Sequence, residues 1–148
     1  MINKKMLVAV ADDDAEDLLF FKKAIASVKM ATELFLFNNG QELMDYLNTP
    51  GNPMPDIVFL DLNMPVKNGM ESLREIRYNS RFKNLSVAIY STSTSESDIK
   101  KTFILGANVY INKPNSLVLL KEVIEKVLNM NWQYQNSKMD KDNFLLRL

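Results

Sequence analysis

The chain has 148 residues and a formal net charge of zero, since 18 Lys and Arg residues balance 18 Asp and Glu residues. This length suits one domain with a full core, and the even charge argues against a nucleic-acid-binding platform. The sequence contains no cysteine and no histidine, which excludes Cys/His zinc sites, thiol nucleophiles and Ser-His-Asp triads.

The first half of the chain alternates short apolar runs with amphipathic segments. Residues 6–11 form an apolar run that ends in acids, which predicts a buried strand. Because this run is too short for a signal peptide or a membrane span, we expect a cytoplasmic protein that does not insert into membranes. Apolar residues at helical spacing predict a helix over 15–28. Three elements follow: a strand over 33–37, a helix from near Gly40 to before Pro50, and an apolar strand over 57–60.

The second half continues this alternation. The pattern predicts a helix over 70–78, a strand over 87–90, a helix over 96–105, a strand over 109–111 and an amphipathic helix from 117 to near Trp132. Ser95 is placed to cap the fourth helix, and Gly106 to end it in the left-handed conformation. Strands and helices thus alternate five times, with connections too long for hairpins. This predicts an open, parallel α/β sheet with helices on both faces.

Polar residues that follow the predicted strands are the main functional signal. In an open α/β sheet, ligands bind beyond the carboxyl ends of the strands. Four strand ends carry polar residues: Asp12, Asp13 and Asp14 after the first, Asp61 after the third, Ser91 and Thr92 after the fourth, and Lys113 after the fifth. We therefore expect carboxylates, hydroxyls and one amine to meet at one edge of the sheet.

Each of these residues also has an ordinary structural explanation. Acids at 12–14 can cap a helix, Asp61 can begin a turn, Ser91 can bond the local backbone, and Lys113 can be a surface amine. Three consecutive acids, however, exceed what capping needs, and their mutual repulsion favours a bound cation such as Mg²⁺, which prefers oxygen ligands. An Asp61 carboxylate beside such a cation and a lysine can act as a nucleophile toward phosphorus.

Four segments in this order resemble the motif set of receiver domains in two-component response regulators: VAVADDDAED, PDIVFLDLNMPVKNG, VAIYSTS and GANVYINKP. The resemblance covers residues 5 to about 131. The segments GQELMDYL and NMNW are further similar to single-domain regulators that partner bacterial phytochromes. The resemblance implies the CheY-like, flavodoxin-like fold, a five-stranded parallel sheet in the order 2-1-3-4-5.

The resemblance also implies a role for individual residues. Asp61 is the phospho-acceptor, and Lys113 pairs with it and then with the phosphoryl group. Mg²⁺ is held by Asp12, Asp13 and Asp61 and by the backbone carbonyl of Asn63. Ser91 is the switch hydroxyl, and Tyr110 is the aromatic whose inward turn reports phosphorylation. From the residues alone, a tyrosine at position 110 within a strand is more often a half-buried packing ring than anything else.

The sequence departs from the family pattern near Lys113. Asn115 stands where an aromatic residue often follows the Lys-Pro pair, and Ser91 stands where threonine is more usual. The hydroxyl is kept at Ser91, so we expect the switch to be kept as well. The resemblance further implies a cis peptide bond between Lys113 and Pro114.

The resulting hypothesis is a stand-alone receiver domain over residues 1–131, followed by a C-terminal extension over 132–148. It takes a phosphoryl group from a sensor histidine kinase or a phosphotransfer protein and then acts through a downstream protein target, with a homodimer left open. It is not an enzyme beyond its own phosphorylation and hydrolysis. Phe144 and the leucines near it are expected to cover an apolar patch on this chain or on a neighbour.

Two alternatives remain open at this stage. An interaction module of the same fold that no longer accepts phosphate usually lacks one of the acids or the lysine, and none is missing here. An aspartyl-phosphate phosphatase also uses a nucleophilic aspartate with Mg²⁺. Its nucleophile follows the first strand, however, and a second acid stands two residues later, where this chain has Asn63.

Overall fold

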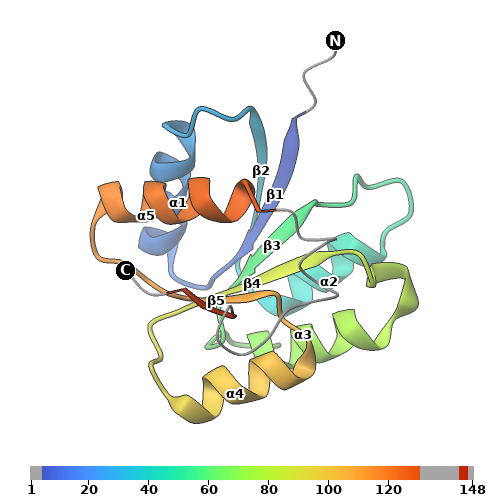
Figure 1. The fold of residues 1–148 in the computed structure, drawn as a ribbon. Coiled ribbons are helices and arrows are strands. Elements are labelled where there is room, and N and C mark those ends of the chain that lie inside the picture. The colour runs from blue at the N-terminus through green and yellow to red at the C-terminus, as the bar shows by residue number, and fades with distance from the viewer. Residues whose placement is uncertain (1–4, 131–143, 147–148) are drawn as a thin grey trace.

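The computed structural model describes residues 5–130 and 144–146, which form one parallel sheet with helices on both faces (Figure 1). The strands are β1 Met6–Ala11, β2 Thr32–Phe37, β3 Ile57–Leu60, β4 Ser86–Ser91, β5 Val109–Asn112 and β6 Leu145–Leu146. The helices are α1 Ala15–Ala26, α2 Gly40–Asn48, α3 Gly69–Tyr78, α4 Glu96–Leu105 and α5 Leu117–Leu128, with a 3-10 helix at Ser80–Phe82.

The strand order is β2-β1-β3-β4-β5-β6, and every neighbouring pair is parallel. The first five strands confirm the predicted order 2-1-3-4-5. The sixth strand was not predicted: Leu145 and Leu146 pair with Tyr110 and Ile111 on the free edge of β5. A strand of two residues is too short to show a sequence periodicity. It forms here because the outer edge of β5 offers unpaired backbone groups.

Two apolar layers hold the helices to the sheet. Successive side chains of a strand point to opposite faces, so Ala9 and Ala11 of β1 pack with α2, α3 and α4, whereas Val8 and Val10 pack with α1 and α5. Figure 1 shows the same division, with α1 and α5 together on one side of the sheet. Strands buried on both faces explain the continuous apolar runs of the sequence.

The ends of the helices follow the side chains that satisfy their free backbone groups. Ser95 caps α4, and Gly106 ends it with φ 103°, as predicted. Helix α1 ends at Ala26, earlier than predicted, because the hydroxyl and backbone N–H of Ser27 both donate to the Ala24 carbonyl. Helix α5 ends at Leu128 instead of near Trp132, which lies outside the described residues, as does the predicted domain boundary at residue 131.

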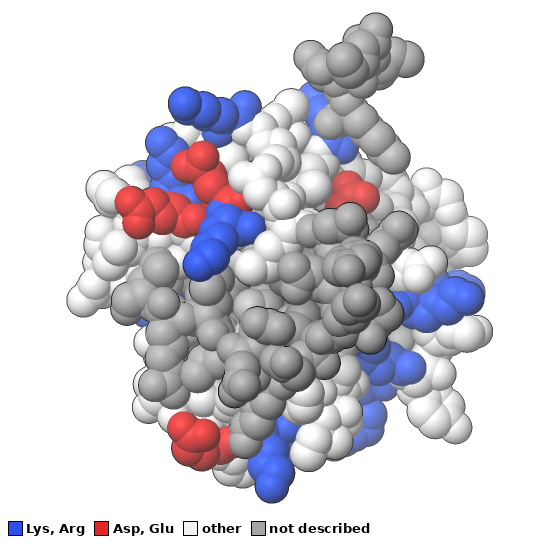
Figure 2. All heavy atoms as spheres, in the orientation of Figure 1, with Lys and Arg blue, Asp and Glu red and all other residues white. Residues whose placement is uncertain are grey.

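Two surface properties bear on possible partners: helix hydropathy, and the placement of charged side chains on one face. Over residues 5–130 and 144–146, the structure has no helix with the length and hydropathy needed to cross a bilayer. On the face drawn in Figure 2, basic side chains lie in separate small groups with acidic side chains among them. This distribution agrees with the zero net charge of the chain.

Candidate functional site

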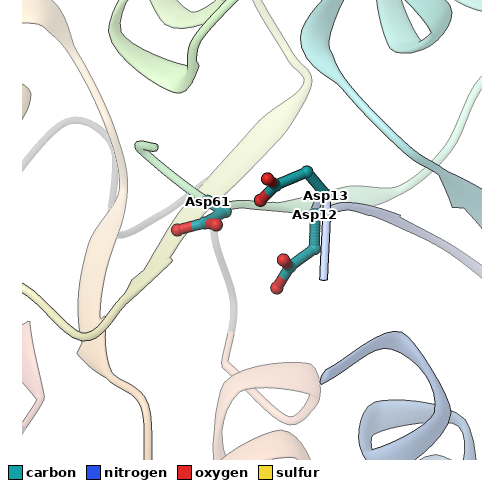
Figure 3. A group of neighbouring side chains, drawn as sticks. All are labelled: Asp12, Asp13 and Asp61. Atoms are coloured by element: carbon teal, nitrogen blue, oxygen red, sulfur yellow. The ribbon is translucent and has the colours of Figure 1, made fainter. Parts of the chain in front are cut away.

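Three carboxylates from two neighbouring strands meet at the carboxyl edge of the sheet. Asp12 and Asp13 directly follow β1, and Asp61 directly follows β3, which is hydrogen-bonded to β1. One carboxylate oxygen from each lies within 4.8 Å of the others, and Figure 3 shows the three side chains next to one another. Asp12 and Asp61 are 1% and 6% exposed, whereas Asp13 is open to solvent. The predicted convergence of the acids is confirmed.

The backbone around Asp61 holds this carboxylate in place. Its N–H donates to the Ala11 carbonyl at 3.0 Å, which extends the β1–β3 ladder by one residue. After the turn, Gly69 begins α3, and its N–H donates to the Leu62 carbonyl. A Cβ atom at Gly69 would lie only 2.0 Å from the Asp61 carbonyl oxygen. The glycine at the end of the segment DLNMPVKNG is therefore required for α3 to begin this close to the acid.

Between these two points the chain passes through a strained residue. Val66 has φ 67°, and the Lys67 N–H donates across it to the Pro65 carbonyl at 2.7 Å, which closes a γ-turn. A positive φ is unfavourable for a β-branched side chain, and turns of this kind are rare. The Val66 side chain is 78% exposed, so it gains nothing from packing that would offset the strain.

Burial sets the electrostatics of the acidic cluster. It raises the pKa of Asp61 to about 6, because desolvation disfavours the carboxylate; the Lys113 ammonium acts in the opposite direction, and the charge of Asp12 adds to the rise. Burial also raises the pKa of Asp12, again opposed by a hydrogen bond from Lys113. Two neighbouring, buried carboxylates thus resist simultaneous ionisation. A bound divalent cation relieves this repulsion.

Lys113 reaches the cluster from the end of β5, but its closest partners differ from those expected. Its Nζ lies 2.8 Å from an oxygen of Asp12, 2.8 Å from an oxygen of Asp17 and 3.6 Å from an oxygen of Asp61. The expected pairing with Asp61 is therefore the longest of the three. Asp17 was missed because an acid in the first turn of a helix is already explained by the helix dipole. No sequence signal places it opposite Lys113.

Ser91 and Tyr110 lie close together on the other side of the site. Both are fully buried, at the end of β4 and within β5. The Ser91 hydroxyl accepts a hydrogen bond from the Ser93 N–H at 3.1 Å, and the Tyr110 hydroxyl donates to the Ser93 carbonyl at 2.8 Å. Burial raises the pKa of Tyr110, and its interactions with Ser93 and Ser91 partly oppose this rise. The Tyr110 side chain is thus turned inward.

Two other expectations have different outcomes. Asp14 caps α1, since its side chain accepts hydrogen bonds from the N–H groups of Glu16 and Asp17, so the capping explanation holds for this acid. The Lys113–Pro114 peptide bond is trans, because none of the described peptide bonds is cis. The expectation of a cis bond was wrong, and trans is the form that X–Pro bonds ordinarily favour.

The acidic cluster fits a divalent cation. Mg²⁺ binds oxygen at about 2.1 Å, so two oxygens on one ion lie at most about 4.2 Å apart. The carboxylate oxygens of Asp12, Asp13 and Asp61 lie within 4.8 Å, and small side-chain shifts are enough to bring them to one ion. An all-oxygen set with an exposed member also leaves room for water ligands, which Mg²⁺ keeps. These three residues are the ones predicted to bind the metal.

Comparison with known proteins places most of the chain in one family of domains. A family model described as the response regulator receiver domain matches residues 8–125. This range includes every residue assigned above to the candidate site. Among characterised relatives, the response regulator Rcp1 of Synechocystis sp. is 27% identical over 129 residues, which cover 84% of this chain and 88% of Rcp1.

Two solved structures show the same architecture. The phosphorylated cyanobacterial phytochrome response regulator RcpA aligns with a TM-score of 0.77 and 30% identity, over 84% of this chain and 91% of that chain. The Mn²⁺-bound form of Rcp1 aligns with a TM-score of 0.75 and 27% identity, over 82% of this chain and 91% of that chain. The names of these two proteins report a phosphorylated form and a bound divalent metal.

Proposed function

Because this chain belongs to the response regulator receiver domain family, we propose that it is a phosphorylation switch in which Asp61 accepts a phosphoryl group in the presence of Mg²⁺. Receiver domains are signalling domains, not enzymes that turn over external substrates. The observation that carries the proposal is the cluster of Asp12, Asp13 and Asp61 within 4.8 Å, with the Lys113 ammonium 3.6 Å from Asp61.

In the proposed reaction, one carboxylate oxygen of Asp61 forms a P–O bond as the P–N bond of a phosphohistidine donor breaks. The electron pair of that bond remains on the imidazole, which takes up a proton. Asp12, Asp13 and the backbone carbonyl of Asn63 would hold Mg²⁺, which neutralises charge on the phosphoryl oxygens when it is bound. The Lys113 Nζ lies 3.6 Å from an Asp61 oxygen, so its ammonium would also neutralise charge on the phosphoryl oxygens.

The phosphoryl group then acts through Ser91 and Tyr110. The Ser91 hydroxyl can donate to a phosphoryl oxygen, and Tyr110 occupies the space beside it. The hydrogen bonding of Ser91 and the inward or outward orientation of Tyr110 would change the surface formed by α4, β5 and α5. We propose that this surface contacts a downstream protein in the cytoplasm. The phosphoryl donor would be a sensor histidine kinase or a phosphotransfer protein. A homodimer remains a further proposal.

Mass spectrometry tests the proposal directly. Incubation with Mg²⁺ and a small-molecule phosphodonor should add one phosphate to the protein, and Asp61→Asn should abolish the addition. Asp45→Asn is the matched control, because Asp45 is an exposed acid on α2 whose carboxylate accepts a hydrogen bond from the Gln41 side chain and lies outside the acidic cluster. Removal of Mg²⁺ by a chelator should also prevent labelling. Phosphate that is still added to Asp61→Asn would exclude Asp61 as the acceptor.

The same experiment addresses both alternatives. A module that no longer accepts phosphate would remain unlabelled at any concentration of donor. A phosphatase would release inorganic phosphate from a generic ester over many turnovers, and Asn63 stands where that class carries its second acid. Asp12, Asp13, Asp61 and Lys113 are all present and lie within one cluster. This arrangement supports the phospho-acceptor proposal over the inactive module and over the phosphatase.

A further inference from the structure

The last described residues lie against the edge of the sheet that borders the switch. Leu145 and Leu146 form β6 on the outer edge of β5, opposite Tyr110 and Ile111. Phe144, which precedes them, is fully buried. An exposed edge strand would leave backbone hydrogen-bonding groups unpaired, and this short segment covers part of that edge. In Figure 1, β6 lies beside β5 at the border of the sheet.

Phe144 belongs to a cluster of three aromatic rings from separate parts of the chain. Its ring centroid lies 5.3 Å from that of Phe103 on α4 and 6.2 Å from that of Tyr110 on β5, and both ring pairs meet edge to face. These distances lie within the favourable range for aromatic pairs. The contacts join the C-terminal segment to α4 and to Tyr110, two parts of the surface that the proposed switch would change.

Tyr110 is therefore restrained at both ends. Its hydroxyl donates to the Ser93 carbonyl at 2.8 Å, and its ring packs against Phe144. An outward turn of Tyr110 would break the hydrogen bond and separate the two rings. The ring contacts involve none of the residues of the acidic cluster, so they act on Tyr110 whatever Asp61 carries.

We propose that Phe103, Tyr110 and the edge of β5 form a docking surface whose occupant is the chain's own segment 144–146, with Phe144 as its anchor. The docked anchor retains Tyr110 in its inward orientation. In signalling, which rests on the proposed function, docking and phosphorylation of Asp61 would favour the same orientation of Tyr110. By linkage, each would strengthen the other by the same factor.

The tether gives the segment an advantage over a free peptide. Thirteen residues join Met130 to Phe144, and covalent attachment over a linker of this length corresponds to an effective concentration on the order of millimolar. A partner with an extended segment and one aromatic residue would meet this surface by the same strand addition. At equal intrinsic affinity and micromolar concentration, it would not displace Phe144. The docking surface thus admits only partners that bind more tightly than the segment itself.

Nitration of tyrosines by tetranitromethane, mapped by mass spectrometry, tests the restraint on Tyr110. Two other tyrosines serve as references within the same chain: Tyr78 is 92% exposed and should react in every sample, whereas Tyr90 is 2% exposed and should react only if the fold is lost. In the full-length parent, Tyr110 should be as protected as Tyr90. In Phe144→Ala, nitration of Tyr110 should accelerate by about tenfold or more, with Tyr90 still protected.

A matched control separates the anchor from a general loss of apolar surface. Ile104 follows Phe103 on α4 and is 69% exposed, so Ile104→Ala should leave Tyr110 protected. If Phe144→Ala also exposes Tyr90, the comparison is made with Phe144→Leu, which keeps most of the apolar volume but removes the ring. The test uses whichever of these two variants keeps Tyr90 protected. If Tyr110 is as protected from nitration in that variant as in the parent, the proposal is overturned.

A second arm relates the docking surface to Asp61. Mg²⁺ with beryllium fluoride, a mimic of the phosphoryl group, should restore protection of Tyr110 in Phe144→Ala, because both interactions favour the same orientation. If Phe144→Ala exposes Tyr110 but the mimic has no effect on it, the docking surface is supported and the proposed function is contradicted. If Phe144→Ala leaves Tyr110 protected without the mimic, the docking surface is excluded, and the proposed function is then tested by phosphate addition to Asp61 alone.

Discussion

Asp61 is a buried acid whose folded environment resists its ionisation, so replacing it with asparagine should stabilise the metal-free protein. Burial raises the pKa of Asp61 from its ordinary 3.8 to about 6. At about 1.4 kcal/mol per pKa unit, this difference corresponds to about 3 kcal/mol of lost stability at neutral pH. Asparagine keeps the shape of the side chain without the charge. Lys113 retains Asp12 and Asp17 as ionic partners in the variant.

The sign of the effect defines its pH window. Between about pH 4 and pH 6 the unfolded chain has lost a proton that the folded chain keeps at Asp61. The unfolded state then binds fewer protons, so the free energy of unfolding of the parent falls as the pH rises. The advantage of Asp61→Asn should be near zero below about pH 4 and reach its full value above about pH 6.

Urea unfolding monitored by circular dichroism, in a chelator and at a series of pH values, measures this difference. For a chain of this length, about 3 kcal/mol corresponds to an increase in Tm of roughly 6–12 °C. Asp45→Asn, an exposed control on α2, should stay within about 0.5 kcal/mol of the parent. Mg²⁺ should reduce the difference in stability between Asp61→Asn and the parent, because the cation stabilises the Asp61 carboxylate of the parent. A variant that is no more stable than the parent at pH 7.5 would refute the reasoning.

Three further substitutions test individual contacts by the same unfolding measurement. Lys113→Met leaves the buried carboxylate of Asp12 without its cation and should lower stability by about 3 kcal/mol at pH 7.5. The loss of stability should become smaller at lower pH, where the carboxylates are protonated. A loss that is the same at both pH values would contradict this electrostatic explanation. Val66→Gly relieves the strain of φ 67° at an exposed position and should raise stability by about 1 kcal/mol. An unchanged midpoint would show that the turn is not strained. Gly69→Ala places a Cβ atom 2.0 Å from the Asp61 carbonyl oxygen and should lower stability by at least about 2 kcal/mol, with weaker stabilisation by Mg²⁺; full tolerance of the methyl group would mean that α3 can move away.

The fold and the acidic cluster could be predicted because they depend on local patterns and on one general property of parallel sheets. Short apolar runs define the strands, two of these runs end in acids, and the carboxyl ends of parallel strands lie at one edge. Once β1 and β3 are neighbours, Asp12 and Asp61 must be close. The motif resemblance determined which strands are neighbours, and the structure confirms that order.

The contacts that could not be predicted join residues whose local sequence has another sufficient explanation. Asp17 reads as an ordinary first-turn acid, yet its distance to Lys113 is the same as that of Asp12. The sequence predicted that Phe144 covers an apolar patch, and the structure confirms this on the same chain. The segment 144–146 is too short, however, to show that the patch lies on α4 and β5. The γ-turn at Val66 is also invisible in the sequence, because valine is not a residue expected at positive φ.

By itself, the sequence of this protein determined the alternation of strands and helices, the edge of the sheet where the acids collect, and the residue types available there. The tertiary structure alone decided which acids Lys113 contacts, how strongly burial raises the pKa of Asp61, and what covers Tyr110. The physical reason is that periodicity and strand polarity act over a few residues. Desolvation and side-chain pairing depend instead on atoms brought together from distant parts of the chain.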